Sequence, residues 1–255
     1  MPDIAPPAAP AQAPADLAAL RAEIDALDDA IHDLLMRRAG VVARLAASRA
    51  KGAGPALRPG REAIILRRLL ARHAGPLPRG ALVRLWRELL CAHTLLQAPL
   101  SAAAWLDEAG TEVLRDHLGL SAPITRCADD TAALAAASNG TAALAAVPAA
   151  GRWWRSETPS SLFVTARLPF FGPSEPTVFL LSPTPPDPSG DDRSLVRLPD
   201  GAEAALAAAG LPAVVLARAE GLALVELPGI IAVGDARLAA PGATVLGFYA
   251  APLTA

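Results

Sequence analysis

The first half of the chain has an apolar pattern that is typical of helices. Residues 15–49 contain no proline and one glycine, Gly40, so a single helix of about 30 residues or more is expected, with Asp16 as its N-cap. Apolar side chains recur at spacings of three and four along one face, at Leu17, Leu20, Ile24, Leu27, Ile31, Leu34, Val41 and Leu45. This spacing predicts a helix that packs along its whole length. Arg38 interrupts this face between Leu34 and Val41.

Two shorter helices are predicted next. Residues 52–60 contain three glycines and two prolines and are expected to form a loop. Helices then follow from about Pro59 to His73 and from about Arg79 to Gln97, separated by the sequence GPLP at 75–78 and ended by Pro99. A first helix of about 30 residues spans about 45 Å, which is too long for the two shorter helices of the same chain to cover. The pattern therefore predicts self-association.

Beyond residue 100 the pattern changes to short helices that alternate with β-rich runs. Four runs predict strands: 161–165, 177–181, 213–216 and 222–225. They indicate a C-terminal α/β or α+β region behind an all-α three-helix region. Residues 182–193 (SPTPPDPSGDDR) are interpreted as a linker or exposed loop that divides this half in two.

Composition narrows the class of protein. The chain has 255 residues, of which 53% are apolar and 19% charged, so it can bury a substantial core. Its apolar runs are broken before the roughly 18 to 20 residues that cross a bilayer, so no membrane association is expected. Residues 1–15, rich in proline and alanine, are expected to form a disordered arm and not a signal peptide. Together with two cysteines, Cys91 and Cys127, that suit no disulfide framework or metal site, this predicts a cytoplasmic protein without a metal.

Charge is distributed unevenly. Residues 1–100 carry 14 Lys and Arg against 9 Asp and Glu, whereas the remainder carries 9 against 16. A positive helical region permits nucleic-acid binding. That interpretation is disfavoured because Arg38 interrupts an apolar face and no aromatic residue precedes Trp86.

An arginine within an apolar face needs an anionic partner, because an unpaired buried charge costs several kcal/mol. For Arg38 the alternatives are a ligand or an ion pair with Glu62 or Glu88. Arg49 lies eleven residues later, about 20° from the same face, so both guanidinium groups can face one interior space that suits a dianion.

Other polar residues can join such a site. His93 and Gln97 share a helix face at a spacing of four, although His93 is equally well explained as a packed core histidine. Arg61 and Glu62 follow a Pro-Gly turn, where helix N–H groups favour anions. Arg21 could reach a site only in a neighbouring chain. The other arginines of this region are interpreted as surface residues: Arg37, Arg44, Arg67, Arg68, Arg72, Arg79, Arg84 and Arg87.

Three segments resemble the all-helical (AroQ-class) chorismate mutase family: LRAEIDALDDAIHDLLMRR, RPGREAIILRRLL and RLWRELLCAHTLLQ, within residues 17–98. The resemblance implies an intertwined homodimer and places a mutase domain at 16–100. It implies that Arg21 serves the partner's site, that Arg38 binds carboxylate, and that Arg61, Glu62 and Gln97 contact the substrate. Departures from the family are Arg49 in place of a lysine, His93 in place of a small hydroxyl residue, and Arg58 in place of an acidic residue.

The implied activity is the rearrangement of chorismate to prephenate in phenylalanine and tyrosine synthesis. The reaction is unimolecular, so it needs no cofactor. Arginines would hold the folded conformer through its carboxylates, while Arg49 and Gln97 would stabilise the charge that develops on the ether oxygen. A neutral Gln97 keeps its donor at ordinary pH, so activity is expected at neutral pH.

The C-terminal half is expected to be a degenerate prephenate dehydratase-like lobe at 101–182, followed by a possible ACT-like regulatory region at 190–255. The Thr-Arg-Phe triplet of dehydratases has no clear counterpart, and the nearest string begins at Thr165. Dehydratase activity is therefore not expected. The alternatives to a mutase are a catalytically inactive, ligand-sensing homologue and a bifunctional mutase and dehydratase.

Overall fold

The computed structural model describes residues 14–49, 56–155, 161–173, 175–239 and 242–253. Two compact units are present, residues 1–52 and residues 53–255. The predicted N-terminal arm lies outside the described residues except for Pro14 and Ala15, which are helical. The units divide at Gly52, whereas the sequence places a domain boundary near residue 100. The second and third helices are therefore built into the same unit as the C-terminal region.

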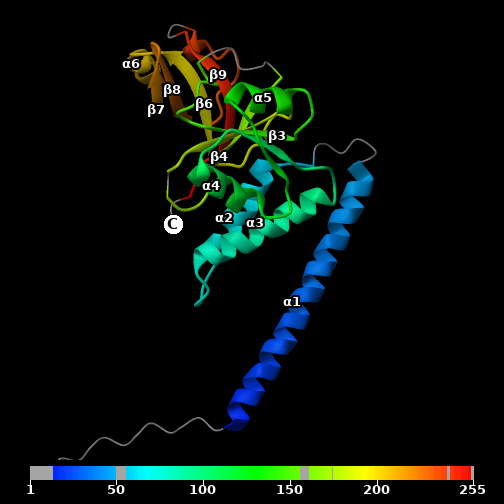
Figure 1. Ribbon diagram of the computed structural model, residues 1–255. Coiled ribbons are helices and arrows are strands. Elements are labelled where there is room, and N and C mark those ends of the chain that lie inside the picture. Colours follow the sequence, from blue (N-terminus) through cyan, green and yellow to red (C-terminus); the bar gives the residue numbers. More distant parts are fainter. Residues whose placement is uncertain (1–13, 50–55, 156–160, 174, 240–241, 254–255) are drawn as a thin grey trace, which may run out of the picture. The chain divides into compact units, whose positions relative to one another are not determined.

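The first unit is the long helix α1 (Pro14–Arg49), with 36 residues, or about 54 Å (Figure 1). The predicted helix is confirmed, although it begins at Pro14, so Asp16 lies inside it and is not its N-cap. The large apolar residues of its predicted seam are 44–63% exposed within the single chain: Leu17, Leu20, Ile24, Leu27, Ile31, Leu34, Val41 and Leu45.

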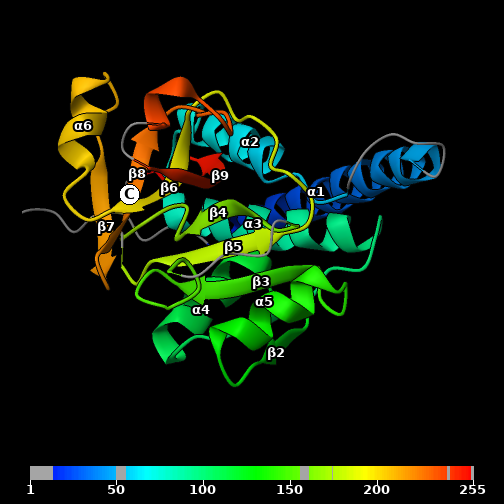
Figure 2. The ribbon, with the colours of Figure 1, turned by 90° about the horizontal axis from the view of Figure 1, so that it is seen from above.

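Helices α2 (Pro59–Ala71) and α3 (Arg79–Leu95) are also confirmed, and each ends two residues before its predicted end. Proline at the start of α2 suits the first helical turn, which has no need of its N–H. Ala63, Leu66 and Leu70 of α2 are buried with Leu82 of α3 and with Phe170 from the C-terminal region. Helix α2 also packs against strand β9 (Thr244–Ala250) (Figure 2).

The C-terminal region is built on one nine-stranded sheet with the order β2-β1-β3-β5-β4-β9-β6-β8-β7. The other strands are β1 (Ala102–Ala104), β2 (Ile124–Arg126), β3 (Leu144–Pro148), β4 (Phe163–Leu168), β5 (Val178–Ser182), β6 (Asp192–Pro199), β7 (Val214–Ala219) and β8 (Leu222–Pro228). The helical elements are α4 (Glu108–Leu118), α5 (Asp130–Ser138), α6 (Glu203–Ala208) and the 3₁₀ turn η1 (Ala236–Leu238). The predicted strands correspond to β4, β5, β7 and β8.

The sheet has two topologically different parts. Strands β1, β2 and β3 are parallel and alternate with α4 and α5, whereas β5 is antiparallel to β3. The second part runs β6-α6-β7-β8-η1-β9 with the strand order β9-β6-β8-β7, which is a ferredoxin-like arrangement whose second helix is reduced to η1. The two parts join where β4 pairs with β9.

Of the two interpretations of residues 182–193, the loop is confirmed for residues 183–191, which include several exposed positions, whereas the linker is wrong. Both flanking strands belong to the same sheet, and Ser182 and Asp192 are buried strand residues. The connecting segment 183–191, here called the β5–β6 loop, packs on α2. The physical reason is that its Asp187 carboxylate satisfies backbone donors of α2 that have no helical partner.

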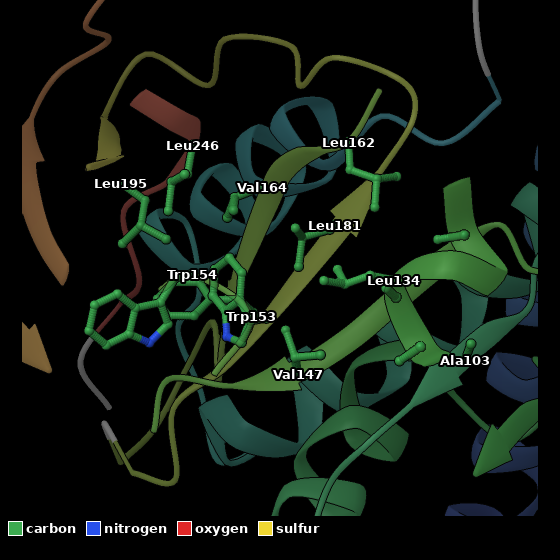
Figure 3. Packing of buried hydrophobic residues seen from close by; sticks show 14 of the residues in the cluster. Ala103, Leu134, Val147, Trp153, Trp154, Leu162, Val164, Leu181, Leu195 and Leu246 are labelled. Atoms are coloured by element: carbon green, nitrogen blue, oxygen red, sulfur yellow. The ribbon is translucent and has the colours of Figure 1, made fainter. Parts of the chain in front are cut away.

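The largest core cluster continues across both parts of the sheet. Figure 3 shows Val147, Val164, Leu181, Leu195 and Leu246, which come from β3, β4, β5, β6 and β9, around Trp153 and Trp154. The indole N–H groups of the two tryptophans donate to the carbonyl oxygens of Pro148 and Ala149, each at 2.9 Å. Both buried indole N–H groups therefore have a hydrogen-bond acceptor, as the burial of tryptophan requires.

The junction of the two parts depends on Gly247. Its φ is +147°, and a Cβ there would overlap the backbone of Val164 on β4. We expect Gly247→Ala to lower the free energy of unfolding by about 2 kcal/mol or more, because strain and overlap add. Denaturant unfolding measures this. The control is Gly80→Ala on α3, where nothing lies within 4 Å and helix propensity favours alanine. Equal stability of the two variants would contradict the prediction.

Candidate functional site

The first turn of α2 is bound by a carboxylate from the β5–β6 loop. Gly60 N donates to Asp187 Oδ1 at 3.0 Å and Arg61 N donates to Asp187 Oδ2 at 3.1 Å. Arg58, at the N-cap position, forms an ion pair with Asp187 Oδ2 at 3.2 Å. The anion-binding position that the sequence predicts at this helix start therefore exists, and the chain's own Asp187 occupies it.

Arg67 binds the same loop nearly two turns further along α2. Its guanidinium donates to the Ser189 carbonyl and hydroxyl oxygens at 3.2 and 2.9 Å. It also donates to the carbonyl oxygens of Asp191 and Ala251 at 2.8 and 2.9 Å. Arg67 is thus a structural clamp, and its interpretation as a surface arginine is wrong.

Glu62 lies in a nearly dry ion pair with Arg87 of α3. Arg87 Nη1 donates to Glu62 Oε2 at 3.0 Å, and the two side chains are 6% and 15% exposed, respectively. Burial raises the pKa of Glu62 above its ordinary value of 4.5; Arg87 opposes this rise and Asp187 adds to it. Burial likewise lowers the pKa of Arg87. Within its own compact unit, Glu62 therefore has Arg87 of α3 as an ion-pair partner.

A cavity of about 20 Å³ adjoins this pair, which is roughly enough for one water molecule. His117 and Cys91 line it together with Glu62 and Arg87. Burial and the charge of Arg87 hold the pKa of His117 well below its ordinary value, and burial raises the pKa of Cys91 to about 11. The cluster therefore combines one ion pair with two groups that are held neutral.

His93 and Gln97 are joined at the end of α3. His93 is buried, and its Nδ1 lies 2.6 Å from the Leu89 carbonyl oxygen. Gln97 follows the last helical turn, and its Nε2 donates to the His93 carbonyl oxygen at 2.7 Å. Among the described residues, Gln97 Oε1 is buried without a hydrogen-bond partner. The pair supports a packed histidine with an adjacent amide that retains bonding capacity.

The predicted site residues thus fall into three groups. Arg58, Arg61 and Glu62 lie together at the start of α2, and His93 and Gln97 lie together at the end of α3. The α1 residues belong to the other compact unit: Arg21 is exposed, and Arg38 is half-buried, which lowers its pKa. Arg49 ends α1, and its side chain lies outside the described part of the chain.

Sequence reasoning missed Arg87, Asp187 and His117. Arg87 was interpreted as a surface residue, yet it is 5% exposed. A signal was present, because Arg87 lies four residues after Val83 and four before Cys91, both of which face the same buried side of α3. Asp187 gave no such signal, since its partners lie about 126 residues away in the sequence.

Two further features are absent from the described residues. Across the described ranges, His, Cys, Asp and Glu form no cluster that could hold a metal ion. Within the same residues, no helix combines the length and apolar character needed to span a membrane.

The Glu62–Arg87 pair makes a prediction about stability. We expect Arg87→Met to lower the free energy of unfolding by about 3–5 kcal/mol at neutral pH, because a buried carboxylate loses its partner. The exposed Arg84 of the same helix provides the control, Arg84→Met, with a change within about 0.5 kcal/mol.

The pH dependence of that loss follows from the sign of the shift. A carboxyl group with a raised pKa in the folded protein favours folding most when it is protonated, and this contribution is lost as pH rises through the raised pKa. The deficit of Arg87→Met should therefore shrink as pH falls through the raised pKa of Glu62, because the protonated carboxyl group no longer needs a cationic partner. Urea unfolding at several pH values measures it, and a deficit that does not depend on pH would contradict it.

Comparisons with known proteins show a similarity in the helical segment. Residues 20–98 match the family model of chorismate mutase type II. A comparison with curated proteins found no match. Solved structures similar to this chain include two prephenate dehydratases and an acylase.

A prephenate dehydratase from Streptococcus mutans has a TM-score of 0.43 and 15% identity, covering 60% of this chain and 100% of that one. A prephenate dehydratase from Arthrobacter aurescens in complex with L-Phe has a TM-score of 0.41 and 14% identity, covering 59% and 90%. A quorum-quenching acylase, GqqA, has a TM-score of 0.40 and 17% identity, covering 60% and 95%. The match to chorismate mutase type II is thus confined to residues 20–98, the segment that contains the helices.

Proposed function

We propose that the protein is a chorismate mutase that converts chorismate to prephenate in the cytoplasm, as part of phenylalanine and tyrosine synthesis. The observation that carries the proposal is the family match over residues 20–98, a segment that contains nearly all of α1 and the whole of α2 and α3. The reaction breaks one C–O bond and forms one C–C bond within a single molecule. The protein's task is to hold the reactive conformer and stabilise the negative charge that develops on the ether oxygen.

The roles of the residues belong to the same proposal. Arginine side chains bind the two carboxylates, Glu62 accepts a hydrogen bond from the substrate hydroxyl, and the Gln97 amide donates to the ether oxygen. The proposed binding arginines are Arg21, Arg38, Arg49 and Arg61, with His93 beside Gln97.

The local geometry is compatible with two of these roles. A carboxylate has about four acceptor positions, so Glu62 can bind Arg87 and still accept from a hydroxyl. An amide nitrogen has two N–H groups, so Gln97 can bind the His93 carbonyl and still donate to a ligand. Arg58 is supported less well as a substrate ligand, because its guanidinium is engaged by Asp187.

The activity is tested with two adjacent arginines on α1. We expect loss of chorismate absorbance with the wild-type chain, and a decrease of about 100-fold or more in kcat/KM for Arg38→Ala, since one charged donor to the transition state is removed. Arg37→Ala is the matched control, because Arg37 is exposed beside Arg38. A wild-type chain that binds chorismate without turnover would instead favour the alternative of an inactive, ligand-sensing homologue.

We also propose a homodimer formed through α1. Support comes from the apolar seam of α1, whose large side chains are 44–63% exposed in a single chain. An apolar stripe that is interrupted only at Arg38 is costly to leave in water, and a second copy with the same stripe can cover it.

The dimer is tested by placing a charge on each side of α1. We expect Ile31→Glu, within the seam, to convert the dimer to a monomer, because a carboxylate would be buried at the helix contact. Ala22→Glu adds the same charge on the opposite side of the helix and should leave the dimer intact. Analytical ultracentrifugation over a range of concentrations measures both. A monomeric wild-type chain would contradict the proposal.

We further propose that the C-terminal region has no dehydratase activity. Thr165, in the string nearest to the dehydratase triplet, is buried in β4 and donates to the Leu180 carbonyl oxygen at 3.3 Å. Arg167 is paired with Glu226 at 2.9 Å. The first turns of α4 and α5 are capped by Asp107 and Asp129, at 2.8 and 2.7 Å. These carboxylates add negative charge where a helix start would otherwise favour an anionic substrate.

The corresponding assay supplies prephenate and looks for phenylpyruvate. We expect no rate above the uncatalysed background, because the residues in question are committed to internal bonds. Measurable turnover would refute this and establish the bifunctional alternative. Prephenate formed from chorismate in the same preparation serves as the positive control for a folded protein.

A further inference from the structure

The start of α2 and the β5–β6 loop form one fastened unit. Asp187 accepts two backbone N–H bonds from Gly60 and Arg61 and an ion pair from Arg58, within 3.0–3.2 Å. Glu62 follows immediately in the helix. The backbone positions of two proposed substrate-binding residues, Arg61 and Glu62, therefore depend on a carboxylate that lies outside the segment that matches the mutase family.

We propose that Asp187 is a positioning residue of the mutase, through which the C-terminal region sets the first turn of α2. The proposal rests on the mutase function and deepens it, because it gives residues beyond 98 a part in chorismate binding. Asp187 acts through the backbone of Gly60 and Arg61 and does not itself contact the substrate.

Close packing and further hydrogen bonds hold the β5–β6 loop against α2. A Cβ on Gly60 would overlap the backbone of Asp187 and Pro188, so the loop approaches the helix as closely as only glycine permits. Arg67 binds the same loop through Ser189 and Asp191. Asp192 in turn accepts from the backbone N–H groups of Ser189 and Gly190 at 3.0–3.2 Å, which orders the loop from within.

The negative charge of Asp187 also affects the pKa of Glu62. The titratable or charged groups around Glu62 are Arg87 and Cys91 on α3, His117 on α4 and Asp187 on the loop. Arg87 favours the ionised form of Glu62, whereas Asp187 opposes it. Removal of the Asp187 charge should therefore lower the pKa of Glu62. Because Glu62 is proposed to accept a hydrogen bond from the substrate hydroxyl in its ionised form, kcat/KM should then fall only at a lower pH than in the wild-type chain.

The experiment compares Asp187→Asn and Asp187→Ala with Asp129→Ala in the full-length chain. Asp129 is a matched control, because its carboxylate likewise caps a helix, α5, through Ala132 N at 2.7 Å. We expect Asp187→Ala to raise the KM for chorismate about three- to tenfold with kcat changed less than about twofold, because α2 must be ordered on binding. Asparagine keeps one acceptor oxygen for the Gly60 or Arg61 N–H but replaces the other oxygen with an amide donor, so Asp187→Asn should restore only part of the KM while still shifting the low-pH limb of kcat/KM.

Each outcome has a separate meaning. If the wild-type chain does not convert chorismate, the proposed function fails, and this role of Asp187 fails with it. If the wild-type chain is active but both Asp187 variants match Asp129→Ala in KM and in pH profile, the role of Asp187 alone is overturned. Thermal unfolding of all three variants accompanies the kinetics. If Asp129→Ala raises the KM as much as Asp187→Ala does, in proportion to the stability that each variant loses, the effect is that of any helix cap. That outcome would also overturn the proposal.

Discussion

Charge buried between α2 and α3 is the constraint around which the second compact unit is arranged. The Glu62–Arg87 pair is almost removed from water, and each partner alone would be strongly destabilising there. The C-terminal region supplies the surroundings that make the pair tolerable. The face of the Phe170 ring lies 5.1 Å from the Arg87 guanidinium carbon, and the β5–β6 loop closes over the start of α2.

This arrangement explains why the compact unit does not end where the helical segment ends. The buried face of α2 contacts Phe170 and Ala250, which come from the strand connections and from β9. Helix α3 alone cannot bury the whole apolar face of α2, because two short helices enclose little apolar surface between them. In this chain, the sheet completes the core of α2 and α3.

The sequence predicts elements best where spacing or residue type is distinctive. The helices follow from three- and four-residue apolar spacing, and β4 and β5 follow from runs that contain Phe, Val and Leu. Strands β1 and β3 were missed because Ala102–Ala104 and Leu144–Pro148 are rich in alanine, which has no β preference. They are strands because the parallel ladder and the core place them there.

The positions of the candidate residues on their helices were predictable in a similar way. Residues whose roles depend on local position, such as the anion-favouring start of α2 and the His93–Gln97 pair, could be located from spacing alone. Arg87 was missed because arginine is usually exposed, so it was interpreted as a surface residue although it lies on the apolar face of α3. Asp187 could not be found from spacing, because its contact with α2 exists only after the sheet has brought distant segments together.

Arg67 shows what the arginine-rich composition means for this architecture. One planar guanidinium reaches four oxygen atoms on three residues, and these lie in two separate segments of the C-terminal region. A lysine carries the same charge but offers three N–H groups on a single nitrogen, so it could not reproduce this fork. At this position the two cationic residues are not interchangeable. In a chain whose single lysine is Lys51, arginine therefore serves here as a fastener of the polypeptide as well as a source of charge.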